Sequence, residues 1–147
     1  AGGPGDETYS EQLRKVISTR ELEPFTRFLG WRDDIVSLMS SADLLIMPSQ
    51  DEGVPNTVQE AMYMGTPVVV STAGGMSEIV AHQATGWVRP LHSHRQWAED
   101  VISCLCDPDR TKGIRCQASR YSAEQFGTKL WGERYLAVID DVLSGPM

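Results

Sequence analysis

Two glutamates, Glu52 and Glu60, stand at the start of a helix-forming segment with seven residues between them. Carboxylates are strong hydrogen-bond acceptors for the hydroxyl groups of a sugar. Gly53 follows the first glutamate and lets the backbone come close to a ligand. The next helix offers free N–H groups and the positive end of its dipole, which favour a phosphate group. Together these features indicate a site for a sugar attached to a phosphate.

Other interpretations of this pair stay open. In the first interpretation the pair has no functional role: Glu52 is a solvated loop residue and Glu60 is a surface residue of a helix. In a glycosidase the two acids would act as acid and base. Only one of them is placed to face a sugar, which disfavours that interpretation. A dinucleotide oxidoreductase is disfavoured further, because no G-x-G-x-x-G motif opens a helix.

The elements around the glutamates alternate between apolar runs and helical periodicity. Residues 44–47 form an apolar run stopped by Pro48, which predicts a strand buried on both faces. Residues 56–64 predict a helix that ends at Gly65. Further strands are predicted over residues 25–29, 67–70 and 87–88, and further helices over residues 7–19 and after Asp33.

After Pro90 the pattern predicts helices only. One is expected over residues 94–106, and Asp107-Pro108 predicts the cap and the first-turn proline of the next. This cap also accounts for Asp107-Pro108-Asp109, which otherwise resembles an Asp-x-Asp metal motif. Ser122-Ala123-Glu124-Gln125 fits a capping box and predicts the start of a final helix.

Strands that alternate with helices predict an α/β fold, a Rossmann-like doubly wound parallel sheet with a helical C-terminal segment. Such sheets bind ligands beyond the carboxyl ends of their strands. This rule selects three loops, at residues 30–33, 49–56 and 71–77. In the third, Gly74-Gly75 is either a plain glycine turn or a direct ligand contact.

Composition narrows the class of protein. The chain has 147 residues, 41% of them hydrophobic, and a net charge of -7. A chain this acidic repels a phosphate backbone, so nucleic-acid binding is not expected. No apolar run approaches the roughly 20 residues of a membrane span. The histidines lack ligand-spaced partners, and no metal site is expected.

The pattern resembles the retaining glycosyltransferases with the two-domain GT-B fold, most closely family 4. Glu52 and Glu60 fit the E-x7-E motif of these enzymes. The resemblance extends over nearly the whole chain in order and spacing. It is carried by Phe28-Leu29-Gly30, Ala42-Asp43, Pro48-Ser49, Glu60-Ala61-Met62, Gly65-Thr66-Pro67-Val68-Val69, Gly74-Gly75 with Glu78, and Thr85-Gly86.

The resemblance implies a role for each matched position. Glu52 would contact the donor hexose as the catalytic residue, and Glu60 would bind the ribose hydroxyls of the nucleotide. Backbone groups around Asn56 and Thr57 would meet the sugar or the diphosphate. The substrate-binding set also includes Gly53, Val54, Pro55, Gly30 and Trp31, the last two beside the base.

One departure concerns the sugar-facing loop. The family often has a Phe-Gly pair where this chain has Val54-Pro55, so the loop is expected to differ in shape. Pro55 has no N–H and cannot donate a hydrogen bond to a ligand.

The resemblance also implies a larger enzyme. Residues 1–147 would form the C-terminal, donor-binding domain of the GT-B fold, incomplete at its N-terminus and with its first strands missing. A glycan or glycolipid acceptor would bind the absent N-terminal domain. The chain alone is expected to be inactive and to pair with another copy or belong to a longer polypeptide, because the strand at residues 25–29 would lack its partner.

The expected donor is a nucleoside-diphosphate sugar, without a cofactor or metal ion. The odd count of three cysteines favours a reducing, cytoplasmic location, and peripheral membrane attachment is compatible with it. A non-catalytic sugar-nucleotide-binding or assembly module with the same fold is the alternative function.

Overall fold

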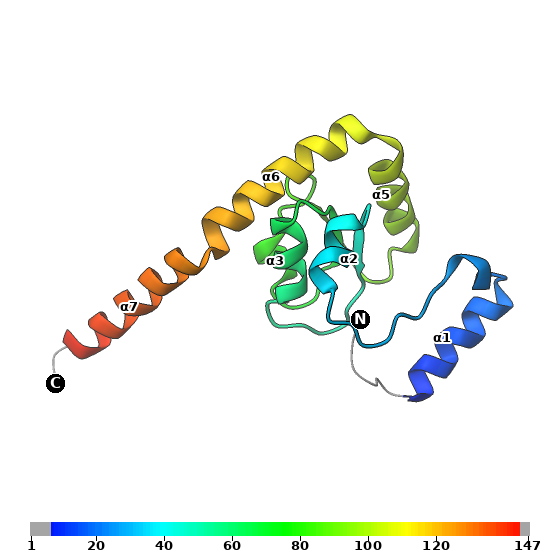
Figure 1. The fold of residues 1–147 in the computed structure, drawn as a ribbon, viewed down its shortest axis with the longest axis horizontal. Helices are drawn as coiled ribbons and strands as arrows, with labels where there is room; N and C mark the ends of the chain where they lie inside the picture. The colour runs from blue at the N-terminus through cyan, green and yellow to red at the C-terminus, as the bar shows by residue number, and fades with distance from the viewer. Residues whose placement is uncertain (1–6, 145–147) are drawn as a thin grey trace. The chain divides into compact units, whose positions relative to one another are not determined.

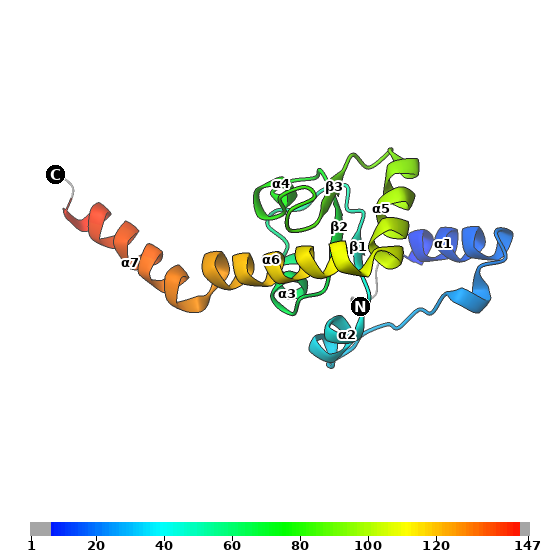
Figure 2. The same cartoon turned by 90° about the horizontal axis from the view of Figure 1, so that it is seen from above.

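The computed structural model describes residues 7–144, which divide into two compact units with the boundary between Ser37 and Leu38. The elements in chain order are α1 (Glu7–Thr19), η1 (Glu23–Phe25), α2 (Ile35–Ser41), β1 (Leu45–Met47), α3 (Asn56–Tyr63), β2 (Val68–Ser71), α4 (Met76–Ile79), β3 (Trp87–Arg89), α5 (His94–Cys106), α6 (Pro108–Phe126) and α7 (Thr128–Ser144). Figure 1 labels most of these elements, and Figure 2 adds the strands.

The second unit holds a parallel sheet in the order β1-β2-β3. Val69 pairs with Ile46 on one side and with Trp87 on the other. Helices α3 and α5 pack against the sheet, and α6 packs against both of them. This arrangement confirms the predicted Rossmann-like α/β fold with its helical C-terminal segment.

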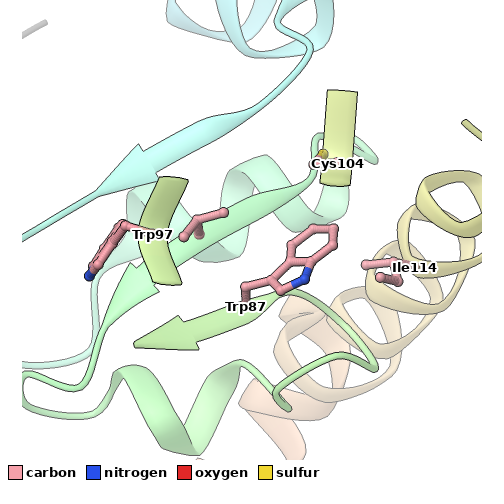
Figure 3. Packing of buried hydrophobic residues seen from close by; sticks show 5 residues of the cluster. Trp87, Trp97, Cys104 and Ile114 are labelled. Carbon is pink, nitrogen blue, oxygen red and sulfur yellow. The ribbon is translucent and has the colours of Figure 1, made fainter. Parts of the chain in front are cut away.

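The central strand β2 is buried along its whole length, as the run of valines predicts. Around Val69 lie side chains from three other elements, Trp87, Trp97, Cys104 and Ile114 (Figure 3). This cluster ties β2 and β3 to helices α5 and α6. The sheet is therefore a rigid base for the loops at its carboxyl end.

The predicted burial of residues 44–47 on both faces is wrong. Strand β1 is an edge strand among the described residues, and the side chain of Ile46 is 47% exposed. An apolar run shows that a strand can be buried, but the neighbours of the strand decide whether it is.

The strand predicted over residues 25–29 is also absent from the described chain. Its backbone N–H groups bond locally instead: Phe25 donates to Leu22 at 3.0 Å and Thr26 to Glu23 at 3.3 Å. Thr26 has extended dihedral angles, but a strand also needs a hydrogen-bonded neighbour. No described segment provides one.

The predicted capping box at Ser122 is wrong as well. Helix α6 continues through Ser122 to Phe126, and the chain becomes extended at Gly127 before α7. The hydroxyl of Ser122 donates to the carbonyl of Gln59 at 3.0 Å instead of capping a helix. The predicted cap at Asp107 is confirmed, since its carboxylate accepts from the N–H of Arg110 at 3.1 Å.

Within residues 7–144, no helix has both the length and the apolar character needed to span a bilayer.

A two-point ion pair joins β3 to α5. Nε and Nη2 of Arg89 donate to the carboxylate of Asp100 at 2.5 and 3.0 Å, and the Asp100 side chain is only 8% exposed. The hydrogen bond to Asp100 raises the pKa of Arg89. Both charged side chains are largely buried, so the removal of either one leaves the other charge buried without a partner.

We predict that Asp100→Ala lowers the free energy of unfolding by about 2 kcal/mol, because it leaves Arg89 without its partner. The adjacent Glu99→Ala is the matched control. Glu99 is 58% exposed in its pair with Arg95, so the change should be below about 0.5 kcal/mol. Urea unfolding of both variants measures the difference. Equal losses of unfolding free energy in the two variants would contradict a larger contribution from the Arg89–Asp100 pair.

Candidate functional site

The loop after β1 carries the first of the two glutamates. Glu52 is half-buried, and its Oε1 accepts a hydrogen bond from the hydroxyl of Ser49 at 3.1 Å. This bond restrains the carboxylate at the carboxyl end of the sheet, where α/β folds bind their ligands. A restrained acceptor at such an edge is suited to orient a hydroxyl group.

The loop after β2 is bonded to the loop after β1. The hydroxyl of Ser71 donates to the carbonyl of Ser49 at 2.7 Å and accepts from the N–H of Ala73 at 3.3 Å. Gly75 donates its N–H to the carbonyl of Gly53 at 2.8 Å. The ends of two neighbouring strands therefore share one hydrogen-bonded structure.

Gly74 and Gly75 make this contact possible. A Cβ on Gly74 would lie 1.5 Å from the carbonyl oxygen of Glu52, and Gly74 has a φ of +52°. A Cβ on Gly75 would lie 2.9 Å from both the carbonyl oxygen of Gly53 and a methyl group of Val54. Neither position has room for a side chain. The glycine pair thus sets the backbone position of the Glu52 loop.

The start of α3 presents unused donors. Pro55 occupies the cap position, and its carbonyl accepts from Val58 and Gln59 at 3.2 and 3.4 Å. In the described part of the chain, the N–H groups of Asn56 and Thr57 have no hydrogen-bond partner. Both residues are exposed, so these donors and the positive end of the helix dipole face solvent.

The other residues of this loop differ in exposure. Gly53 and Val54 are exposed, whereas Pro55 is buried beneath the start of the helix. Gly53 has open space where a Cβ would be. The exposed surface of the predicted loop is therefore formed by Gly53, Val54, Asn56 and Thr57.

Glu60 is exposed on α3, one turn inside the helix. It lines a groove of about 390 Å³ between α3 and the junction of α6 with α7. Asn56, Ser122 and Phe126 line the same groove, and Glu52 is not among its lining residues. The two glutamates thus flank the N-terminus of α3 on separate surfaces.

Helix α6 holds α3 through three hydrogen bonds that sequence analysis missed. The side chains of Arg115, Ser119 and Ser122 donate to the carbonyls of Gly65, Tyr63 and Gln59 at 2.6, 3.0 and 3.0 Å. These donors are spaced four and three residues apart and so share one face of α6. Polar side chains at that spacing are the signal that could have revealed them.

Gly30 and Trp31, predicted beside the base, lie in the first unit. Trp31 is 80% exposed. Next to it, Arg32 donates from Nε and Nη2 to the carboxylate of Asp34, which raises the pKa of Arg32 and lowers that of Asp34. This pairing satisfies the charge of Arg32 within the loop.

Another groove, of about 820 Å³, contains none of the predicted site residues. It is lined by α5, α6 and the turn at Gly65, which precedes β2 and so lies at the opposite end of the sheet. Over residues 7–144, no cluster of three or more histidine, cysteine or acidic side chains could hold a metal ion.

A parallel sheet with polar, glycine-rich loops at its carboxyl edge defines a Rossmann-like α/β domain of the kind found C-terminally in GT-B glycosyltransferases. The family model described as Glycosyl transferases group 1 matches residues 1–129. The chain belongs to this family and is a glycosyltransferase domain.

Curated relatives carry glycosyltransferase and synthase names. N-acetyl-alpha-D-glucosaminyl L-malate synthase of Bacillus anthracis is 28% identical over 89% of this chain and 34% of its own length. D-inositol 3-phosphate glycosyltransferase of Thermobispora bispora is 33% identical over 70% of this chain and 24% of its own. The chain thus spans about a third or less of each.

Solved structures show the same fold. Anabaena Alr3699/HepE in complex with UDP is 28% identical, with a TM-score of 0.88 over 92% of this chain and 37% of that chain. Its complex with UDP-glucose is 27% identical, with a TM-score of 0.86 over 93% of this chain and 38% of that chain.

We predict that Gly74→Ala destabilises the chain by more than about 1 kcal/mol. The left-handed backbone alone accounts for about that amount, and the clash with Glu52 adds to it. Gly53→Ala is the control, because its Cβ would meet open space. Thermal unfolding compares the two variants. A Gly74→Ala protein as stable as the control would contradict the close approach of the loops.

Proposed function

We propose that this chain is the donor-binding domain of a retaining glycosyltransferase that transfers a hexose from a nucleoside-diphosphate sugar to an acceptor hydroxyl. Family membership and the neighbours that bind UDP or UDP-glucose support a nucleotide-sugar donor. The observation that carries the proposal is the arrangement at the carboxyl edge of the sheet. Glu52 lies in the loop before α3, two free N–H donors lie at the start of this helix, and Glu60 lies one turn inside it.

In this proposal Glu52 is the catalytic residue. Its carboxylate orients the hexose and stabilises the positive charge that develops at the anomeric carbon as the bond to the diphosphate breaks. The acceptor oxygen then forms the new bond with the anomeric configuration kept, and its proton passes to the departing nucleoside diphosphate. The bond from Ser49 supports this role, because a carboxylate fixed before the reaction needs little reorganisation.

The start of α3 receives the diphosphate and sugar. The N–H groups of Asn56 and Thr57 point to solvent with the positive end of the helix dipole, which favours an anionic group. Gly53 and Val54 complete the sugar-facing surface above the buried Pro55. Charge stabilisation by N–H donors needs no metal ion or other cofactor, and we propose that none takes part.

Glu60 binds the ribose. Its carboxylate is exposed and lines the groove between α3 and α6, so both oxygens can accept from the two ribose hydroxyls. The three hydrogen bonds from α6 support this assignment, because they fix the helix that carries Glu60. The contact of Gly30 and Trp31 with the base stays a prediction from the family resemblance.

In this proposal the binding site for the acceptor, a glycan or glycolipid, belongs to another part of a longer protein. The chain spans 34% of one curated relative and 24% of another, so it would supply one part of such an enzyme. A cytoplasmic site of action, with or without peripheral membrane attachment, fits the three free cysteines.

We expect one of UDP, GDP and ADP to bind the chain, with UDP first in view of the neighbours. Glu60→Ala should weaken that binding at least about tenfold, because charged hydrogen bonds to the ribose are lost. Ligand-observed NMR on both proteins measures this. Glu124→Ala is the control, since it removes another exposed helix carboxylate.

Each result separates one part of the proposal from the rest. Binding that survives Glu60→Ala would refute the ribose assignment. Absence of binding to the folded chain would refute donor binding by this domain alone. Binding without any transfer, even after the chain is joined to an acceptor domain, would identify a non-catalytic sugar-nucleotide-binding module.

A further inference from the structure

Strand β2 ends in a buried serine. Three valines precede Ser71, which is itself only 1% exposed. A buried hydroxyl costs free energy unless it is hydrogen-bonded, so an apolar residue would be the simpler choice at this position. The Ser71 hydroxyl donates to the carbonyl of Ser49 at 2.7 Å and accepts from the N–H of Ala73 at 3.3 Å. Both partners are backbone groups of the loops at the carboxyl edge of the sheet, so the hydroxyl serves these loops.

Pro48 explains why a side chain makes this link. The pairing of β1 with β2 ends where Met47 lies opposite Val70. The next residue, Pro48, has no N–H and cannot continue the ladder. The sheet therefore stops fixing the chain before the loop begins. Ser71, one residue beyond the last pair, bonds the carbonyl of Ser49 with its side chain instead.

The bonded carbonyl belongs to the residue that holds the first glutamate. The backbone of Ser49 accepts from Ser71, while the side chain of Ser49 donates to Oε1 of Glu52 at 3.1 Å. A fixed backbone at Ser49 sets where its own hydroxyl can point. Two consecutive hydrogen bonds thus connect the buried end of the central strand to the carboxylate of Glu52.

Glu52 lies between two attached residues. On its N-terminal side, Ser49 is bonded by Ser71. On its C-terminal side, the carbonyl of Gly53 accepts from the N–H of Gly75 at 2.8 Å. Attachment at two points restricts the segment more than either bond alone, because the loop cannot rotate about a single contact. Loss of the Ser71 bond would leave the segment attached on one side.

We propose that Ser71 is a positioning residue for Glu52. It is too buried to contact a donor itself. Its hydroxyl fixes the backbone of Ser49, and the Ser49 hydroxyl then fixes the carboxylate that orients the hexose. The inference rests on the proposed function, since it assigns Ser71 to the sugar-binding step of the same site. Removal of the hydroxyl therefore affects recognition of the hexose more than recognition of the nucleotide.

The test compares the binding of UDP and of UDP-glucose to the whole chain by titration calorimetry. The ratio of the UDP Kd to the UDP-glucose Kd isolates the contribution of the hexose, because the nucleotide is common to both ligands. Ser71→Ala should lower this ratio at least about threefold, since Glu52 loses a hydrogen-bonded support. A ratio unchanged from that of the wild-type chain would overturn the proposal.

Thr66→Val is the matched control. Thr66 lies just before the other end of β2, is also 1% exposed, and donates its hydroxyl to the carbonyl of Met39 at 2.6 Å. The variant removes a similar buried bond far from the carboxyl edge of the sheet. It should lower the stability of the chain and leave the ratio of the two Kd values unchanged. An equal fall of the ratio in both variants would show a general structural effect and overturn the proposal.

Glu52→Gln separates this inference from the proposed function. It should lower the same ratio, and the addition of Ser71→Ala to it should lower the ratio no further, because Ser71 acts through Glu52. A further fall in the double variant would overturn the positioning role alone. A ratio that Glu52→Gln leaves unchanged would refute the contact of Glu52 with the hexose, and with it both proposals.

Hydrogen exchange tests the attachment without any ligand. The amide of Gly75 reports on the contact between the two loops, because it is bonded to Gly53. Ser71→Ala should speed its exchange at least about tenfold through easier local opening, whereas Thr66→Val should not. An unchanged exchange rate in Ser71→Ala would overturn the proposal whether or not the chain binds UDP.

Discussion

The close approach of two loop backbones is the constraint on which the candidate site depends. Gly74 and Gly75 lie against the carbonyls of Glu52 and Gly53, where no side chain fits. One hydrogen bond, from Gly75 to Gly53 at 2.8 Å, closes the contact. Since β1 and β2 are neighbours in a parallel sheet, their loops must emerge together. The glycines convert this proximity into a fixed position for the loop that carries Glu52.

A second set of contacts fixes the helix on the far side of that loop. Helix α6 donates three side-chain hydrogen bonds to carbonyls in the middle of α3, at its end and in the turn after it. The buried cluster around Val69 anchors α5 and α6 to the sheet. The loop before α3 is thus fixed by the β2 loop, and the middle and end of α3 are fixed by α6. Binding sites gain affinity when their groups are held in place before the ligand arrives.

Helix α7 contrasts with this packed region. Its neighbour α6 buries four residues, whereas α7 buries none. Trp131 and Arg134 of α7 line a groove together with Val54 of the loop before α3 and Asn56 at the start of that helix. The first turns of α7 therefore lie beside the candidate site.

The sequence alone determined the order of the main elements, the parallel α/β class, the cap at Asp107 and the residues of the predicted donor loop. Local periodicity, capping and motif spacing carry this information, because they are properties of neighbouring residues. The tertiary structure decided the rest. It left residues 25–29 without a strand, exposed β1 at an edge and carried α6 through Ser122. It also brought Gly74 onto Glu52 and Ser122 onto Gln59. Each of these depends on a partner distant in the chain, and no local pattern specifies which distant group will be there.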